Sequence, residues 1–147
     1  MFYITRSEAE TEALGARTAK ELLARFPDGA VFAMFGGLGM GKTAFVRGMA
    51  IGLGLDAEVS SPTFALVNDY GPLVHFDMYR LEGTDEADLA STGFYDYLEA
   101  GRMLAVEWSE HIEDYLPPGT VRAVFEKLGD DTRKIIITGD GYENTRN

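Results

Sequence analysis

The sequence predicts an α/β fold, a three-layer sandwich in which helices cover both faces of a central mixed sheet. Residues 30–35 and 103–106 are apolar at every position, which is typical of strands buried on both faces of a sheet. Segments with helical periodicity, such as residues 7–26, alternate with these runs. Two pairs of strand-like segments joined by short turns predict hairpins, which would add antiparallel strands and make the sheet mixed.

The first part of the chain is predicted to form a strand, a helix and a second strand. Residues 2–5 have the pattern of a short strand, and the following helix is expected to run from Ser7 to Phe26. The pattern S-E-A-E that begins at Ser7 has the form of a capping box. After a turn, residues 30–35 predict a central parallel strand.

A second helix is predicted after the glycine-rich segment that follows this strand. Apolar residues recur at helical spacing from Phe45 to Leu53. Gly48 and Gly52 lie on the same stripe, so we expect the helix to pack closely against the sheet, at a propensity cost of about 1 kcal/mol for each glycine. Gly54 is expected to end the helix.

The middle of the chain predicts a hairpin and two short helices. Residues 64–70 and 73–79 are strand-like and flank a Gly-Pro pair. Thr84 is expected to cap a short helix that stops near Gly93, and residues 94–100 are expected to form a second one.

The last part of the chain is predicted to complete the sheet. Residues 103–106 form another buried strand, and a short helical stretch is expected from Ser109. Residues 121–128 and 134–138 predict a closing hairpin, and residues 139–147 resemble a flexible polar tail. With no repeat or linker, the 147 residues are predicted to form a single domain.

The segment GGLGMGKT, residues 36–43, matches the phosphate-binding pattern G-x-x-x-x-G-K-[ST] between a strand and a helix. Glycines let successive backbone N–H groups turn toward phosphate oxygens, and the helix adds its positive N-terminal end. We expect Lys42 to reach the β- and γ-phosphates and the Thr43 hydroxyl to ligate Mg²⁺. The alternative is a plain glycine-rich turn. The motif favours a P-loop NTPase-like domain.

A phosphate loop also needs carboxylates that hold the metal and orient water, and these normally lie where a buried strand ends. Asp77 and Glu107 each close a predicted strand, and either is expected to lie across from Thr43. Glu107 is the first choice for the metal because its strand is the more apolar. A structural alternative for each acid is the capping of a loop or helix.

Composition restricts the classes of partner. The chain has 13 basic and 24 acidic residues, a net charge of −11, and no basic cluster, so we do not expect it to bind DNA or RNA by itself. No apolar run approaches the length of a membrane helix, and no secretion signal is apparent. The absence of cysteine suits a reducing cytoplasm, where we expect the protein to act.

Four blocks, GGLGMGKTAF, SPTFALVNDY, HFDMYRL and EWSE, occur in this order and together resemble the TsaE (YjeE) family. That family comprises the small ATPase of bacterial N6-threonylcarbamoyladenosine tRNA modification. The resemblance extends from about the first helix to the last hairpin. It implies that ATP and Mg²⁺ are bound by this chain.

The resemblance also implies roles for individual residues. The metal would be held by Thr43 and Glu107, with Asp77 in the metal or water shell and Lys42, Glu107 and Asp77 as the catalytic group. Thr63 would belong to a nucleotide-sensing switch, and Trp108 matches the tryptophan beside the acid. The nucleotide-binding residues, of which the first and last would flank the adenine, are Thr11, Gly37, Leu38, Gly39, Met40, Gly41, Lys42, Thr43, Ala44 and Arg133.

Two positions depart from the family pattern, which usually has Asp at position 37 and Pro at position 109, where this chain has Gly37 and Ser109. These departures bear on the stiffness of the loop. Arg80 is expected either to stabilise charge on the transferred phosphoryl group or to pair with an acid. His75 is expected to be packed or to face a partner, and Arg47 to be a surface residue.

These residues predict an ATP-hydrolysing accessory protein that is slow alone and activated in a complex, because no glutamine and no arginine finger is evident. The resemblance implies that the partners are TsaD and TsaB, which install threonylcarbamoyl on adenosine 37 of tRNA, and that tRNA is met only through them. A small-molecule kinase is disfavoured because residues 82–99 lack Arg and Lys. A guanine-nucleotide switch is disfavoured because D-x-x-G and N-K-x-D are missing.

Overall fold

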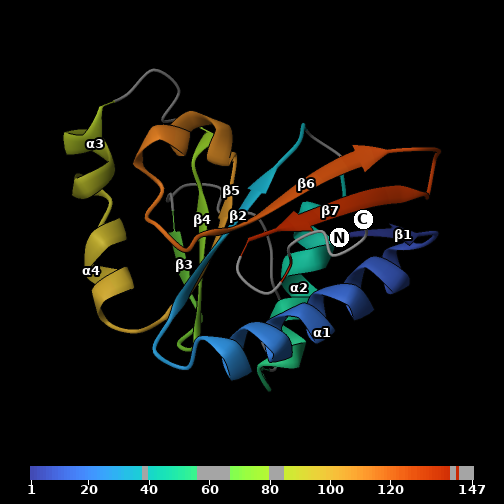
Figure 1. Ribbon diagram of the computed structural model, residues 1–147, viewed down its shortest axis with the longest axis horizontal. Helices are drawn as coiled ribbons and strands as arrows, with labels where there is room; N and C mark the ends of the chain where they lie inside the picture. The colour runs from blue at the N-terminus through green and yellow to red at the C-terminus, as the bar shows by residue number, and fades with distance from the viewer. Residues whose placement is uncertain (38–39, 56–66, 80–84, 140–141, 143–147) are drawn as a thin grey trace.

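The computed structural model describes residues 1–37, 40–55, 67–79, 85–139 and 142, shown in Figure 1. The elements, in chain order, are β1 (Phe2–Thr5), α1 (Glu8–Arg25), β2 (Ala30–Phe35), α2 (Lys42–Gly52), β3 (Val67–Asp69), β4 (Leu73–Asp77), α3 (Glu86–Ser91), α4 (Phe94–Glu99), β5 (Met103–Glu107), the 3-10 helix η2 (Ser109–Tyr115), β6 (Val121–Lys127) and β7 (Arg133–Thr138). None of the helices in these ranges is long and apolar enough to cross a membrane.

The sheet is mixed, as predicted. Within the described residues it has seven strands in the order β1-β7-β6-β2-β5-β4-β3. The central strands β6, β2, β5 and β4 are parallel, whereas β1, β7 and β3 pair antiparallel with their neighbours. The carboxyl ends of β2, β4 and β5 therefore lie at the same edge, where ligands of open α/β sheets commonly bind.

Helices cover both faces of the sheet, which confirms the three-layer prediction (Figure 1). On one face, α1 and α2 bury Leu22, Phe45 and Met49 against Phe32 and other strand residues. The rings of Phe32 and Phe45 stack at 5.3 Å between centroids. On the other face, α3, α4 and η2 form a second core over β4, β5 and β2.

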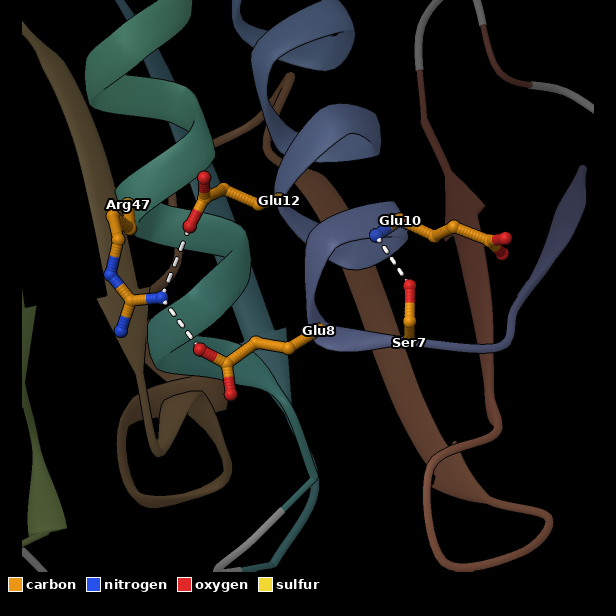
Figure 2. A network of polar contacts seen from close by, with 5 residues as sticks. All are labelled: Ser7, Glu8, Glu10, Glu12 and Arg47. Atoms are coloured by element: carbon orange, nitrogen blue, oxygen red, sulfur yellow. Dashed lines mark hydrogen bonds and ion pairs between the residues drawn. The ribbon is translucent and has the colours of Figure 1, made fainter.

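The start of α1 differs in one detail from the predicted capping box. The Ser7 hydroxyl accepts a hydrogen bond from the Glu10 backbone N–H at 3.1 Å, as expected for an N-cap (Figure 2). The Glu10 carboxylate, however, accepts from the Arg6 N–H at 2.8 Å instead of that of Ser7. The side chain thus satisfies a backbone donor one residue before the predicted one.

The glycines of α2 do not face the sheet, which corrects the prediction. A Cβ atom added to Gly48 would lie 1.8 Å from the backbone oxygen of Glu12, and one added to Gly52 would lie 2.3 Å from that of Ala16. Both glycines therefore allow α2 to approach the backbone of α1. A helical stripe contacts whatever is nearest, and here large side chains such as Phe45 contact the sheet while the glycines contact the neighbouring helix.

The cap of α3 also corrects the sequence prediction. Asp85, not Thr84, is the N-cap residue, and it forms a capping box with Asp88. Either residue type can cap a helix, but the carboxylate three residues after Asp85 completes the reciprocal pair. Thr84 lies outside the described residues. The helix ends at Ser91, and Gly93 precedes α4 as predicted.

The prediction of a flexible tail from residue 139 does not hold for Tyr142. This residue is buried, its hydroxyl donates to Glu21 Oε1 at 2.8 Å, and Arg25 lies over its ring. Burial raises the pKa of the phenol, and the hydrogen bond to Glu21 adds to the effect. Tyr142 thus fastens the chain after β7 to α1. Residues 140–141 and 143–147 lie outside the described ranges.

Candidate functional site

The glycine-rich segment lies between β2 and α2, in the strand–loop–helix setting that the motif requires. Gly36 and Gly41 have positive φ values of 136° and 91°, which L side chains rarely adopt. A Cβ atom on Gly36 would also lie 2.9 Å from the Phe125 backbone oxygen. Glycine at these two positions therefore lets the chain leave the sheet and begin α2 at Lys42.

A cavity of about 670 Å³ opens beside the start of α2, a size typical of small-molecule sites. It brings together ten of the predicted site residues: Thr11, Met40, Gly41, Lys42, Thr43, Ala44, Asp77, Glu107, Trp108 and Arg133. Gly37 is described but does not line the cavity, and a Cβ atom there would meet nothing within 4 Å. Leu38, Gly39, Thr63 and Arg80 lie outside the described residues.

The two predicted acids lie side by side. Asp77 is the last residue of β4 and Glu107 the last of β5, and the register of these parallel strands pairs them directly. Asp77 accepts a hydrogen bond from the Tyr79 N–H at 2.9 Å, whereas Glu107 is only 5% exposed. Both acids and Thr43 line the same cavity, which Met40 and Gly41 of the glycine-rich segment also line.

Lys42 is nearly buried and has several close contacts. Its Nζ donates to the Gly36 carbonyl oxygen at 2.5 Å and lies 4.5 Å from the centroid of the Trp108 ring. Burial lowers the pKa of its amine, and the nearby carboxylates of Glu107, Glu110 and Asp77 oppose this effect. Glu110 also accepts a hydrogen bond from the Gly36 N–H at 2.9 Å, so the loop's first residue is held on both sides.

Trp108 follows Glu107 in a left-handed backbone conformation with φ 58°, the only such residue other than glycine in the described part of the chain. Strain of this kind is common at functional sites. Its ring packs against Tyr79 at 5.0 Å and stacks on His111 at 5.5 Å. The hydroxyl of buried Ser109 donates a hydrogen bond to the Val106 carbonyl oxygen and closes this turn.

Thr11 and Arg133 approach the loop near Gly41. A Cβ atom on Gly41 would lie 3.7 Å from the side chains of both residues. The Thr11 hydroxyl shares a buried hydrogen bond with Thr5 at 2.7 Å, and Arg133 donates to backbone carbonyls of the β6–β7 turn. These contacts place the two side chains beside the loop at Gly41, and their expected position beside an adenine stays a prediction.

Comparison with protein families gives a match to the model described as "Threonylcarbamoyl adenosine biosynthesis protein TsaE", over residues 5–135. The chain belongs to the TsaE family. Its function is therefore in the biosynthesis of threonylcarbamoyladenosine in tRNA.

Relatives of the TsaE family align with nearly the whole chain. The tRNA threonylcarbamoyladenosine biosynthesis protein TsaE of Bacillus subtilis is 39% identical over 95% of this chain and 87% of its own. The protein of the same name from Treponema pallidum is 33% identical over 91% and 97%. The crystal structure of Bacillus subtilis YdiB superposes with a TM-score of 0.73 at 31% identity, covering 97% of this chain and 88% of that one.

Sequence reasoning missed several residues that line the cavity of this TsaE family member. They are Ser7, Glu8, Arg47, Tyr79 and Asp131. Arg47, expected on the surface, donates to Glu8 at 3.0 Å and to Glu12 at 3.1 Å and so joins α2 to α1 (Figure 2). The helical spacing could have predicted this position of Arg47, because Arg47 lies one turn after Thr43 and therefore on the same face of α2.

His75 was also missed as a neighbour of the site. It is buried, as expected of a packed residue, but its Nε2 lies 2.5 Å from Glu107 Oε2. The available signal was the spacing of His75 and Asp77, because residues two apart on a strand point to the same face.

Proposed function

We propose that the protein binds ATP with Mg²⁺ in this cavity and hydrolyses it as an accessory protein of tRNA threonylcarbamoylation. One observation carries this proposal. The lysine and threonine of a phosphate-loop motif line the same cavity as two acids from adjacent strand ends. This is the set of groups that P-loop NTPases use for nucleotide and metal.

The donor set fits Mg²⁺, which prefers oxygen ligands and usually takes only one or two carboxylates together with waters and phosphates. The Thr43 hydroxyl and the carboxylates of Asp77 and Glu107 are all oxygen donors at the cavity wall. Among the described residues there is no cluster of three or more His, Cys, Asp or Glu side chains that would form a cage by itself. When bound, Mg²⁺ would neutralise charge on the phosphate oxygens.

Different residues of the chain would bind the phosphates, hold the metal and exclude water. Lys42, at the N-terminal end of α2, would bind the β- and γ-phosphates in place of the Gly36 carbonyl. Thr43 and Glu107 would hold the metal, and Glu107 or Asp77 would orient the attacking water. Trp108 and Tyr79 would exclude bulk water from that side, because their rings pack together at the cavity wall.

Slow hydrolysis by the isolated protein is part of the proposal. The sequence contains no glutamine to orient water. Among the described residues, two arginines line the cavity, and both are engaged elsewhere, Arg47 with Glu8 and Glu12 and Arg133 with the β6–β7 turn. We propose that TsaD and TsaB are the partners that accelerate turnover, and that tRNA is met through them.

The test measures phosphate release from ATP by the protein alone and with TsaD, TsaB and tRNA. We expect a higher rate in the complex. Glu107→Gln should lower the rate at least about a hundredfold while ATP binding is retained, because it removes an acid from the proposed metal and water site. Glu99→Gln is the matched control, since Glu99 is exposed at the end of α4. Equal rates with and without partners would refute activation, and a failure to bind ATP would refute the whole proposal.

A further inference from the structure

The buried histidine of β4 contacts the acid at the end of β5. His75 is 0% exposed and Glu107 5% exposed, and the distance between His75 Nε2 and Glu107 Oε2 is 2.5 Å. A carboxylate oxygen only accepts hydrogen bonds, so Nε2 carries the hydrogen and donates it. A short charge-assisted bond between two buried groups is among the stronger side-chain interactions of proteins.

Strand register explains why these two residues meet. His75 pairs with Ala105 on β5, and Glu107 lies two residues farther along the same strand. Residues 75, 105 and 107 therefore point to the same face of the sheet, the face that α2 covers. Because Ala105 has only a methyl group, the Glu107 side chain has room to reach back over it to the imidazole.

The remaining contacts of His75 do not account for its presence in the core. Its Nδ1 atom is buried and has no hydrogen-bond partner among the described residues. A leucine or phenylalanine would fill a comparable volume without burying polar nitrogens, which costs free energy when they are unpaired. The hydrogen bond to Glu107 is thus the one polar contact at this position in the described structure that favours histidine.

We propose that His75 is a positioning residue that fixes one oxygen of Glu107, so that the other is presented to the metal. This inference rests on the proposed function, because it concerns the acid that would hold Mg²⁺. Hydrogen-bond partners of metal-binding carboxylates and histidines orient those ligands, and their loss typically weakens metal binding 10- to 100-fold. His75 is placed to act on Glu107 in this way without lining the cavity itself.

The experiment compares three substitutions of His75. His75→Leu removes the donor, His75→Gln keeps an N–H group at about the reach of Nε2, and His75→Asn keeps an N–H group on a shorter side chain. Mn²⁺ is titrated into each protein saturated with a non-hydrolysable ATP analogue, and its affinity is followed by electron paramagnetic resonance. The affinity for the analogue is measured separately in EDTA.

We expect roughly tenfold weaker Mn²⁺ binding for His75→Leu and His75→Asn, with most of the affinity restored in His75→Gln. The affinity for the analogue in EDTA should be unchanged in all three, because His75 does not line the cavity. Thr18→Val is the control for general loss of stability. Thr18 is equally buried and hydrogen-bonded, to Leu14, but does not line the cavity.

The outcomes separate this inference from the proposed function. If the unsubstituted protein binds no Mn²⁺ with the analogue, the metal site itself is refuted. If it binds Mn²⁺ and His75→Leu binds equally well, or if the glutamine variant is no better than the asparagine variant, only the positioning role is refuted. Should His75→Leu fail to fold, the difference in Mn²⁺ affinity between His75→Gln and His75→Asn still tests whether His75 positions Glu107.

Discussion

Lys42 shows how a single side chain of the site is held at a cost to stability. Its ammonium is nearly buried, and desolvation outweighs the three nearby carboxylates in lowering its pKa. A lysine shielded from water in this way is favoured by function rather than by folding. The Gly36 carbonyl and the Trp108 ring hold its end in place beside the proposed phosphate position.

Substitution of this lysine should separate binding from folding. Lys42→Met keeps most of the buried stem but removes the charge that would contact the phosphates. We expect at least tenfold weaker ATP binding by calorimetry and a midpoint of thermal unfolding no lower than that of the unsubstituted protein. Retained ATP affinity would contradict the assigned role of Lys42.

Trp108 offers a direct signal from the site, because it is the only tryptophan in the chain. Its ring lies 4.5 Å from Lys42 Nζ, so transfer of the ammonium to a phosphate should change the indole emission. We expect ATP with Mg²⁺ to alter the intrinsic fluorescence of the protein. Lys42→Met should lack the change at nucleotide concentrations that saturate the unsubstituted protein. An unaltered emission despite binding would show that this contact persists in the complex.

Both α1 and α2 contribute residues to the cavity wall, and glycines let the backbones of these two helices approach each other. Gly15 of α1 makes a similar close contact with α2, because a Cβ atom at this position would lie 2.1 Å from the Phe45 backbone oxygen. Arg47 adds ion pairs with Glu8 and Glu12, which lie at the end of α1 nearest the glycine-rich segment. The position of the loop helix is therefore fixed by its neighbour as well as by the sheet.

The packing of these helices predicts a large effect of one added methyl group. Gly48→Ala would place Cβ against the Glu12 backbone, so we expect a loss of about 1–3 kcal/mol in the free energy of unfolding, measured in urea. Gly37→Ala is the control, because a Cβ atom there meets nothing within 4 Å. Equal stability of the two variants would show that α2 can move away from α1 without cost.

The segment after β7 gives a prediction about pH. Burial raises the pKa of Tyr142 above its ordinary value near 10. As the pH rises above about 10, the unfolded state therefore loses this proton while the folded state still keeps it. The contribution of Tyr142 is therefore complete below about pH 10 and declines as the pH rises further. Tyr142→Phe should be less stable at neutral pH by about 1 kcal/mol but should lose stability less steeply in alkali. Parallel pH profiles of the two proteins would refute the anchoring contact.

Local patterns in the sequence predicted most elements and the core of the site. The run 30–35, the loop motif and the acids at positions 77 and 107 depend on residues near one another in the chain, and the structure places them as expected. Patterns of this kind do not specify which elements become neighbours. The contacts of Gly48 with α1 and of His75 with Glu107 depend on helix packing and strand order, so neither was predicted.

For the molecule as a whole, the net charge of −11 predicts weak direct contact with tRNA. With 24 acidic and 13 basic residues, the protein would repel a polyanion at most approaches. We expect fluorescence anisotropy to detect no binding of labelled tRNA by the protein alone at physiological salt, and to detect its association once TsaD and TsaB are present. Tight binding by the isolated protein would contradict access through partners.

The pairing of β1 with β7 has a consequence for how the molecule is made. The strand at residues 2–5 leaves the ribosome long before its hydrogen-bonding partner, the strand at residues 133–138. During synthesis the earlier strand therefore has no β7 partner until residues 133–138 have emerged, so this edge of the sheet closes late. A nascent chain arrested before residue 133 should therefore expose this strand to proteases, whereas the finished protein protects it.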